Sequence, residues 1–192
     1  IQAARQRYDD VRVYVFSDHG MTDVHQHLDL IKSIQALPLR FGHDYLAYYD
    51  STMARFWFRS ESAETQIRAA LSAVSGGRPL SDHELERNGV LFPDRRYGEL
   101  IFLCDPGVLI CPSFMGRKPM KGMHGYDPSD RHSRASFQTN SRVGPVPERL
   151  DQMFDLMNWE AERINSRVQA ERIVLDSKSG TTAASSLTEA VS

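Results

Sequence analysis

The chain has 192 residues, of which 41% are hydrophobic and 25% are charged, and its formal net charge at pH 7 is -2. These fractions are typical of a globular protein, and the length is sufficient for one domain with a sizeable core. A nearly balanced charge gives no electrostatic support for binding to nucleic acid or to an acidic membrane surface. No apolar run approaches the roughly 20 residues that a membrane-spanning helix needs. Function must therefore be argued from motifs.

Residues 1–10 are polar and compatible with a short helix that leads into a strand. Residues 11–16 read Val-Arg-Val-Tyr-Val-Phe, and this β-branched and aromatic run predicts a buried strand. The strand is followed at once by Ser17, Asp18, His19 and Gly20. Open α/β sheets bind ligands just outside the carboxyl ends of their strands, and a carboxylate beside an imidazole is a ligand set that zinc accepts. The plainer alternative is a helix cap with a surface histidine.

Residues 28–37 are more apolar than the polar stretch before them, and Pro38 ends them. Their spacing fits a helical stripe about as well as a short strand followed by a helix. His25 and His27 alternate, so an extended backbone could point both the same way. We expect them to be solvated loop histidines and not metal ligands.

Residues 44–58 are rich in strand-forming side chains and predict two strands joined by a turn at residues 50–52. Thr52 lies in this turn without an adjacent base or metal ligand, so it is not predicted to be a nucleophile. The aromatic side chains could stack on a nucleotide base, but filling the core of a small sheet is the favoured interpretation. They are Tyr45, Tyr48, Tyr49, Phe56 and Trp57.

A helix over residues 62–74 is predicted from apolar positions that recur every three or four residues, and two glycines follow it. Residues 81–88 are charged and predict a solvated helical turn. Strands at 100–104 and 108–111 flank an Asp-Pro-Gly turn and predict a hairpin. In that register Cys104 and Cys111 would not face each other, so we expect two buried free thiols. Residues 41–111 together suggest an inserted α+β subdomain.

His124 stands between glycines in the loop sequence Gly122-Met123-His124-Gly125, so no bulky neighbour blocks access to its imidazole. Nearby cationic side chains could meet a phosphate oxyanion, although a solvated loop is the commoner explanation. These are Arg117, Lys118 and Lys121.

Two prolines open a helix predicted over about residues 148–172, which has an apolar side. Residues 177–192 are rich in Ser, Thr, Ala and Gly. They lack the apolar groups that would offset the entropy of ordering, so the segment 176–192 is predicted to be a disordered tail.

Taken together, Ser17-Asp18-His19-Gly20-Met21 after an apolar strand and Gly122-Met123-His124-Gly125-Tyr126 about a hundred residues later resemble the type I phosphodiesterase/nucleotide pyrophosphatase family. The resemblance runs from about Val11 to Trp159. This family is part of the alkaline phosphatase superfamily. The resemblance implies an α/β fold with a mixed sheet and flanking helices, formed by residues 1–40 and 112–175. It also implies two zinc ions, or other divalent cations, with Asp18 and His19 on one and His124 on the other.

Family members also carry an upstream metal-binding Asp, a Thr or Ser nucleophile, and an Asp-x-x-x-His pair. Nothing in this sequence matches these elements, so we expect the chain to be the C-terminal portion of a longer protein. Its partners would then be a phosphodiester or nucleotide substrate and the missing N-terminal half of the same domain, and the fragment alone would be inactive. Alternatives are a phosphomonoesterase, a phosphonate or sulfate ester hydrolase, or a non-enzymatic remnant. The compartment and the identity of the nucleophile stay open.

Overall fold

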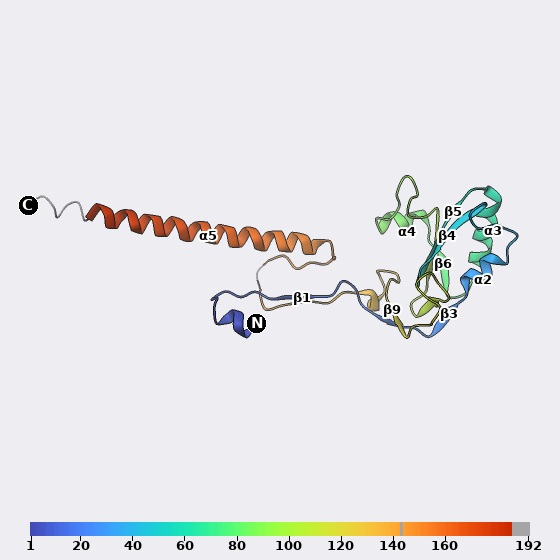
Figure 1. Ribbon diagram of the computed structural model, residues 1–192, viewed down its shortest axis with the longest axis horizontal. Coiled ribbons are helices and arrows are strands. Elements are labelled where there is room, and N and C mark those ends of the chain that lie inside the picture. The colour runs from blue at the N-terminus through green and yellow to red at the C-terminus, as the bar shows by residue number, and fades with distance from the viewer. Residues whose placement is uncertain (143, 186–192) are drawn as a thin grey trace, which may run out of the picture. The chain divides into compact units, whose positions relative to one another are not determined.

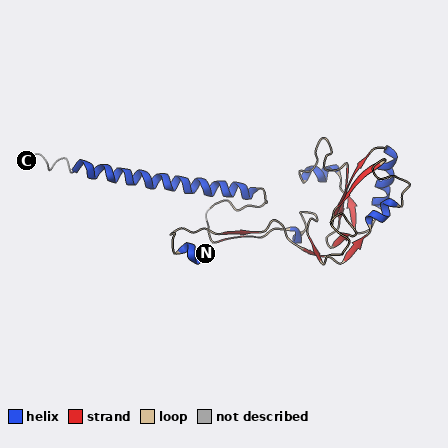
Figure 2. Ribbon diagram, in the orientation of Figure 1, coloured by secondary structure: helices blue, strands red, loops and turns tan. Residues whose placement is uncertain are grey.

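The structure is a computed structural model that describes residues 1–142 and 144–185. It divides into two compact units, one formed by Ile1–Val15 with Phe137–Ser192 and the other by Phe16–Ser136. Helices accompany both parallel and antiparallel strand pairs, as the sequence predicted for a mixed α/β fold (Figure 2).

The larger unit is built on a four-stranded antiparallel sheet in the order β4-β5-β7-β6 (Figure 1). β4 (Tyr45–Tyr49) and β5 (Met53–Phe58) form the predicted hairpin. β7 (Leu100–Cys104) lies between β5 and β6 (Gly77–Pro79). The sheet therefore joins segments that are up to about sixty residues apart in the chain.

The core of this unit lies between the sheet and two helices, α2 (Leu30–Gln35) and α3 (Glu61–Ser72). α3 begins at Ser60, whose hydroxyl accepts a hydrogen bond from the Ala63 amide, and it buries one face at four-residue intervals. The buried residues of that face are Ala63, Ile67 and Leu71. Of the five aromatic side chains expected in the core, Tyr45, Tyr49 and Phe56 are buried, whereas Tyr48 and Trp57 are only half-buried.

Two short strand pairs extend the larger unit. β2 (Thr22–Asp23) pairs antiparallel with β9 (Gly122–Met123), and β3 (Gln26–Leu28) pairs parallel with β8 (Val108–Ile110). Of the two interpretations of residues 28–37, the strand followed by a helix is confirmed. The predicted helical turn near residue 81 is α4 (Asp82–Arg87), and a 3₁₀ turn, η1, covers Arg131–Ser133.

The prediction that the strands at residues 100–104 and 108–111 form a hairpin is wrong. β7 and β8 flank the expected turn but do not pair with each other. Both edges of β7 are already taken, since the Cys104 amide donates to the Thr52 carbonyl on one side and Gly77 is its partner on the other. β8 therefore pairs with β3 instead. Both cysteines are free, with Cys104 buried and Cys111 only half-buried.

In the smaller unit, the predicted buried strand is short and largely exposed. β1 (Tyr14–Phe16) pairs only with β10 (Phe137–Thr139) among the described residues, and Val15 and Phe16 are 57% and 45% exposed. A strand becomes buried when both of its edges and both of its faces are covered, and here only one edge is paired. The helix expected near the start of the chain is α1 (Gln2–Arg5).

The C-terminal helix is longer than predicted, because α5 spans Gln152–Ser185 without a break (Figure 1). α5 thus covers residues 176–185 of the segment 176–192 that was predicted to be a disordered tail, and residues 186–192 lie outside the described part of the chain. No helix within the described residues is long and apolar enough to cross a membrane.

Candidate functional site

The two histidine motifs meet because of one strand pair. β2 begins shortly after His19, and β9 ends immediately before His124. The two strands are antiparallel with Thr22 opposite Met123, so the residues before β2 and the residues after β9 lie at the same end of the pair.

The imidazole rings of His19 and His124 stack at that end, with their centroids 3.7 Å apart and their planes 14° from parallel. Asp18 is close as well, since its Oδ2 atom lies 3.4 Å from Nε2 of His19. The structure thus brings together all three residues that the sequence predicted as metal ligands. The site is open to solvent because the side chains of Asp18 and His19 are 72% and 36% exposed.

The tautomer of His19 follows from its second contact. Nδ1 of His19 lies 2.7 Å from the carbonyl oxygen of Gly20. Since a carbonyl can only accept a hydrogen bond, this contact requires a proton on Nδ1. In the neutral imidazole, Nε2 then keeps its lone pair and is the nitrogen that can bind a metal ion.

Gly20 holds this arrangement through a close backbone approach. Its amide donates to the carbonyl of Ser133 at 3.1 Å, and a Cβ atom at position 20 would lie 1.9 Å from the carbonyl oxygen of His132. No side chain fits in that space unless the backbone of η1 moves. The glycine of the Asp-His-Gly motif is therefore required by packing against η1.

The loop that carries His124 is fixed at the two residues that follow the histidine. Gly125 has a φ of +90°, which favours glycine, and its carbonyl accepts a 2.8 Å hydrogen bond from the hydroxyl of the buried Thr52. Tyr126 then enters the hydrophobic core, where burial raises the pKa of its phenol to about 12 and keeps it neutral. His124 itself, directly before these two anchors, remains exposed.

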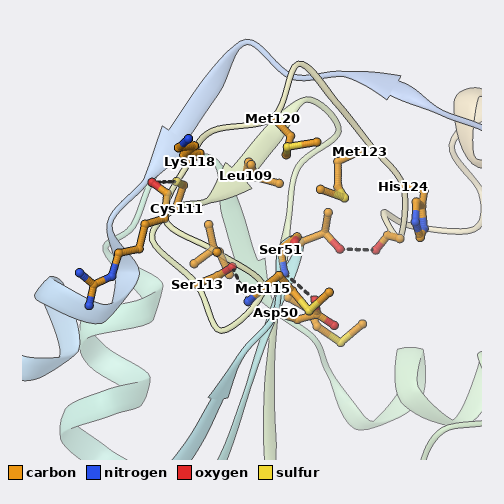
Figure 3. Close-up of a pocket in the computed structure, with 16 residues that line it drawn as sticks. Asp50, Ser51, Leu109, Cys111, Ser113, Met115, Lys118, Met120, Met123 and His124 are labelled. Atoms are coloured by element: carbon orange, nitrogen blue, oxygen red, sulfur yellow. Dashed lines mark hydrogen bonds between the residues drawn. The ribbon is translucent and has the colours of Figure 1, made fainter.

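A pocket of about 550 Å³ lies beside His124 and is lined by residues of the β4–β5 turn, of β8 and of residues 111–125. Figure 3 shows Lys118 at one end of this pocket and His124 at the other, with Met120 and Met123 between them. Arg117 also lines it, whereas Lys121 does not. Two of the three predicted cations therefore face the same pocket as His124.

No sequence pattern indicated the methionines of this pocket or the contact made by Thr52. The contact between Thr52 and Gly125 joins residues 73 positions apart, which no local pattern reports. His25 and His27 are exposed, as expected for solvated histidines, but His27 lies in β3 and not in a loop.

The donor chemistry of the site fits zinc. Two ligand atoms held about 2.0–2.1 Å from one tetrahedral zinc ion lie about 3.3 Å from each other. The separation of 3.4 Å between Asp18 Oδ2 and His19 Nε2 matches that spacing. Within the described residues, however, no three His, Cys, Asp or Glu side chains are grouped so that they could hold one ion. These residues alone therefore supply only part of a coordination shell.

A sequence model of the family described as type I phosphodiesterase/nucleotide pyrophosphatase matches residues 1–127 of the chain. No curated protein matches the chain. Among solved structures, murine ectonucleotide pyrophosphatase/phosphodiesterase 5 is 24% identical with a TM-score of 0.54, over 68% of this chain and 34% of that one. The human protein is 21% identical with a TM-score of 0.51, over 67% of this chain and 33% of that one.

Phosphonoacetate hydrolase from Sinorhizobium meliloti, solved with phosphonoformate, is 16% identical with a TM-score of 0.51, over 71% of this chain and 37% of that one. At these identities the likeness shows a shared fold. The chain spans about a third of the length of these solved structures.

Proposed function

The chain belongs to the type I phosphodiesterase/nucleotide pyrophosphatase family, and we propose that it supplies part of the metal site of a zinc-dependent hydrolase of phosphodiester or pyrophosphate bonds. Family membership and the fold agree with the resemblance and the fold class predicted from the sequence. The observation that carries the proposal is the convergence of Asp18, His19 and His124 from two distant motifs.

In this proposal Asp18 and His19 bind one zinc ion and His124 binds the other. Two zinc ions, when bound, would lower the pKa of an attacking hydroxyl and stabilise the charge on the phosphoryl oxygens. Other residues of the chain orient the two histidines for metal binding. The Gly20 carbonyl fixes the His19 tautomer, and Thr52 holds the backbone next to His124.

The nucleophile and the remaining zinc ligands are proposed to lie in a part of the family domain that this chain does not contain. Thr52 does not replace the nucleophile, because it is buried and its hydroxyl donates to Gly125. The 192-residue chain alone should therefore not hydrolyse diesters at a measurable rate. The division into a catalytic part, residues 1–40 and 112–175, and an inserted part, residues 41–111, belongs to the same proposal.

A nucleotide is the proposed type of substrate, since an inactive variant of the murine relative was solved in complex with AMP. Phosphonate hydrolysis is the second candidate, and the observation that favours it is the shared fold with phosphonoacetate hydrolase. Both reactions place a phosphorus centre with negatively charged oxygens at the metal site. An assay with both types of substrate therefore distinguishes the two candidate functions.

The test uses the gene product that carries the whole family domain, assayed with bis(p-nitrophenyl) phosphate, p-nitrophenyl phosphate and phosphonoacetate, with and without a chelator. We expect chelator-sensitive hydrolysis that favours the diester and falls at least about 100-fold in His124→Ala, because removing a metal-site group commonly costs that much. His43→Gln, on an exposed loop of the same unit, serves as the control. A preference for the phosphonate would support the second candidate, and hydrolysis that survives the chelator would contradict the metal-dependent proposal.

A further inference from the structure

The pocket beside His124 contains a feature that metal binding alone does not require, namely a wall of four methionines. They are Met53, Met115, Met120 and Met123. We call this cavity the methionine pocket. Its volume of about 550 Å³ lies within the range of small-molecule sites.

The apolar surface of the methionine pocket is exposed on one side and firmly supported on the other. Met115 and Met120 are 68% and 56% exposed, whereas Leu109 and Ile110 behind them are buried. Methionine side chains are flexible and polarizable, so they adapt to apolar groups of different shape. The pocket therefore offers an adaptable apolar surface on a rigid base.

The charge in the pocket is unevenly distributed. Arg117 and Lys118 are exposed, and neither forms an ion pair with any described residue. The acidic residue of the lining, Asp50, accepts a hydrogen bond from the Ser51 amide and lies away from Lys118 in Figure 3. The Lys118 end of the pocket is therefore free to bind an anion.

We propose that the methionine pocket binds an apolar aromatic or alkyl part of the substrate that carries an anionic substituent at its far end. The phosphorus centre would lie at the His124 end, the apolar body along the methionines, and the anion against Lys118 (Figure 3). The assignment of this group to the substrate rests on the proposed function, because that function places the phosphorus at His124.

The test measures binding and needs neither metal nor turnover. The probes are 8-anilinonaphthalene-1-sulfonate, which is aromatic and anionic, and N-phenyl-1-naphthylamine, which has the same rings without the sulfonate. Fluorescence titrations are made with the full chain, with Lys118→Gln and with Met115→Ala. The matched controls are Lys32→Gln on α2 and Met157→Ala on α5, both exposed and outside the pocket.

Lys118→Gln should weaken sulfonate binding about two- to fivefold and leave the uncharged probe unchanged, as expected for loss of one exposed charge. Met115→Ala should weaken both probes about threefold or more, since it removes apolar contact area. The controls should change neither. Equal effects of Lys118→Gln and Lys32→Gln, or no binding of the sulfonate, would overturn the inference. Because the titrations contain no zinc, their failure is independent of any failure of the hydrolysis assay.

Discussion

The stacked imidazoles of His19 and His124 depend on a small number of individual backbone contacts. Gly20 touches the carbonyl of His132, and Gly125 accepts from the Thr52 hydroxyl. Each contact fixes the loop next to one histidine. Single substitutions at these contacts should therefore disturb the histidines without removing them.

Gly20→Ala should destabilise the chain by about 1–3 kcal/mol, because its Cβ would force the backbone of η1 to move. Thermal or urea unfolding followed by circular dichroism measures the change. Gly122→Ala is the matched control, since a Cβ there meets only ordinary contacts with Met21 at 3.5 Å and with the Thr22 carbonyl oxygen at 3.7 Å. If both variants were equally stable, the tight approach at Gly20 would not be real.

Thr52→Val should cost about 0.5–1.5 kcal/mol, because the Gly125 carbonyl loses its buried donor. It should also change the NMR shifts of the His124 ring, which a stability loss elsewhere would not do. Thr52→Ser keeps the hydroxyl and should restore the His124 shifts. Identical His124 spectra in Thr52→Val and in the wild type would contradict a positioning role.

At the scale of elements, α4 is tied to the edge of the sheet by one carboxylate. Glu84 accepts hydrogen bonds from both terminal nitrogens of Arg78 on β6, and it completes a capping box with Ser81. The Arg78 hydrogen bonds and those from Ser81 lower the pKa of Glu84 from 4.5 to about 2. The folded state therefore favours the ionised carboxylate.

This pKa shift predicts how stability depends on pH. Since the folded pKa lies below the unfolded value, the Glu84 contribution is complete above about pH 4.5 and is lost as the pH falls towards 2. Denaturant unfolding at pH 7, 4.5 and 3 should show a smaller acid loss in Glu84→Gln than in the wild type. Glu86→Gln, on the exposed side of the same helix, should keep the wild-type loss. A wild-type acid loss retained in Glu84→Gln would refute this role.

Elements with a local signal were predictable from the sequence. The hairpin of β4 and β5 follows from aromatic strand formers around a short turn, and α3 follows from Ala63, Ile67 and Leu71 at helical spacing. The pairing of β8 was not predictable in this way. It depends on β5 and β6 already occupying β7, and that competition involves strands distant in sequence.

At the scale of the whole molecule, the candidate site was predicted by resemblance and not by local pattern. Periodicity could place Asp18 and His19 after a strand, but only the family comparison connected them to His124. The structure adds the physical reason for their meeting, which is the antiparallel pair of β2 and β9. The methionine pocket had no sequence signal, because its walls come from separate segments.

The central claim is that Asp18, His19 and His124 bind zinc, and the most direct test is a zinc titration of the histidine-¹⁵N-labelled gene product that carries the whole family domain. Long-range ¹H–¹⁵N spectra report on the ring nitrogens of its histidines, including the seven in these 192 residues. We predict that His19 Nε2 and a ring nitrogen of His124 shift first, and that His124→Ala removes only its own response because the two bind separate ions. First responses at other histidines of this chain, or none at His19 and His124, would contradict the claim.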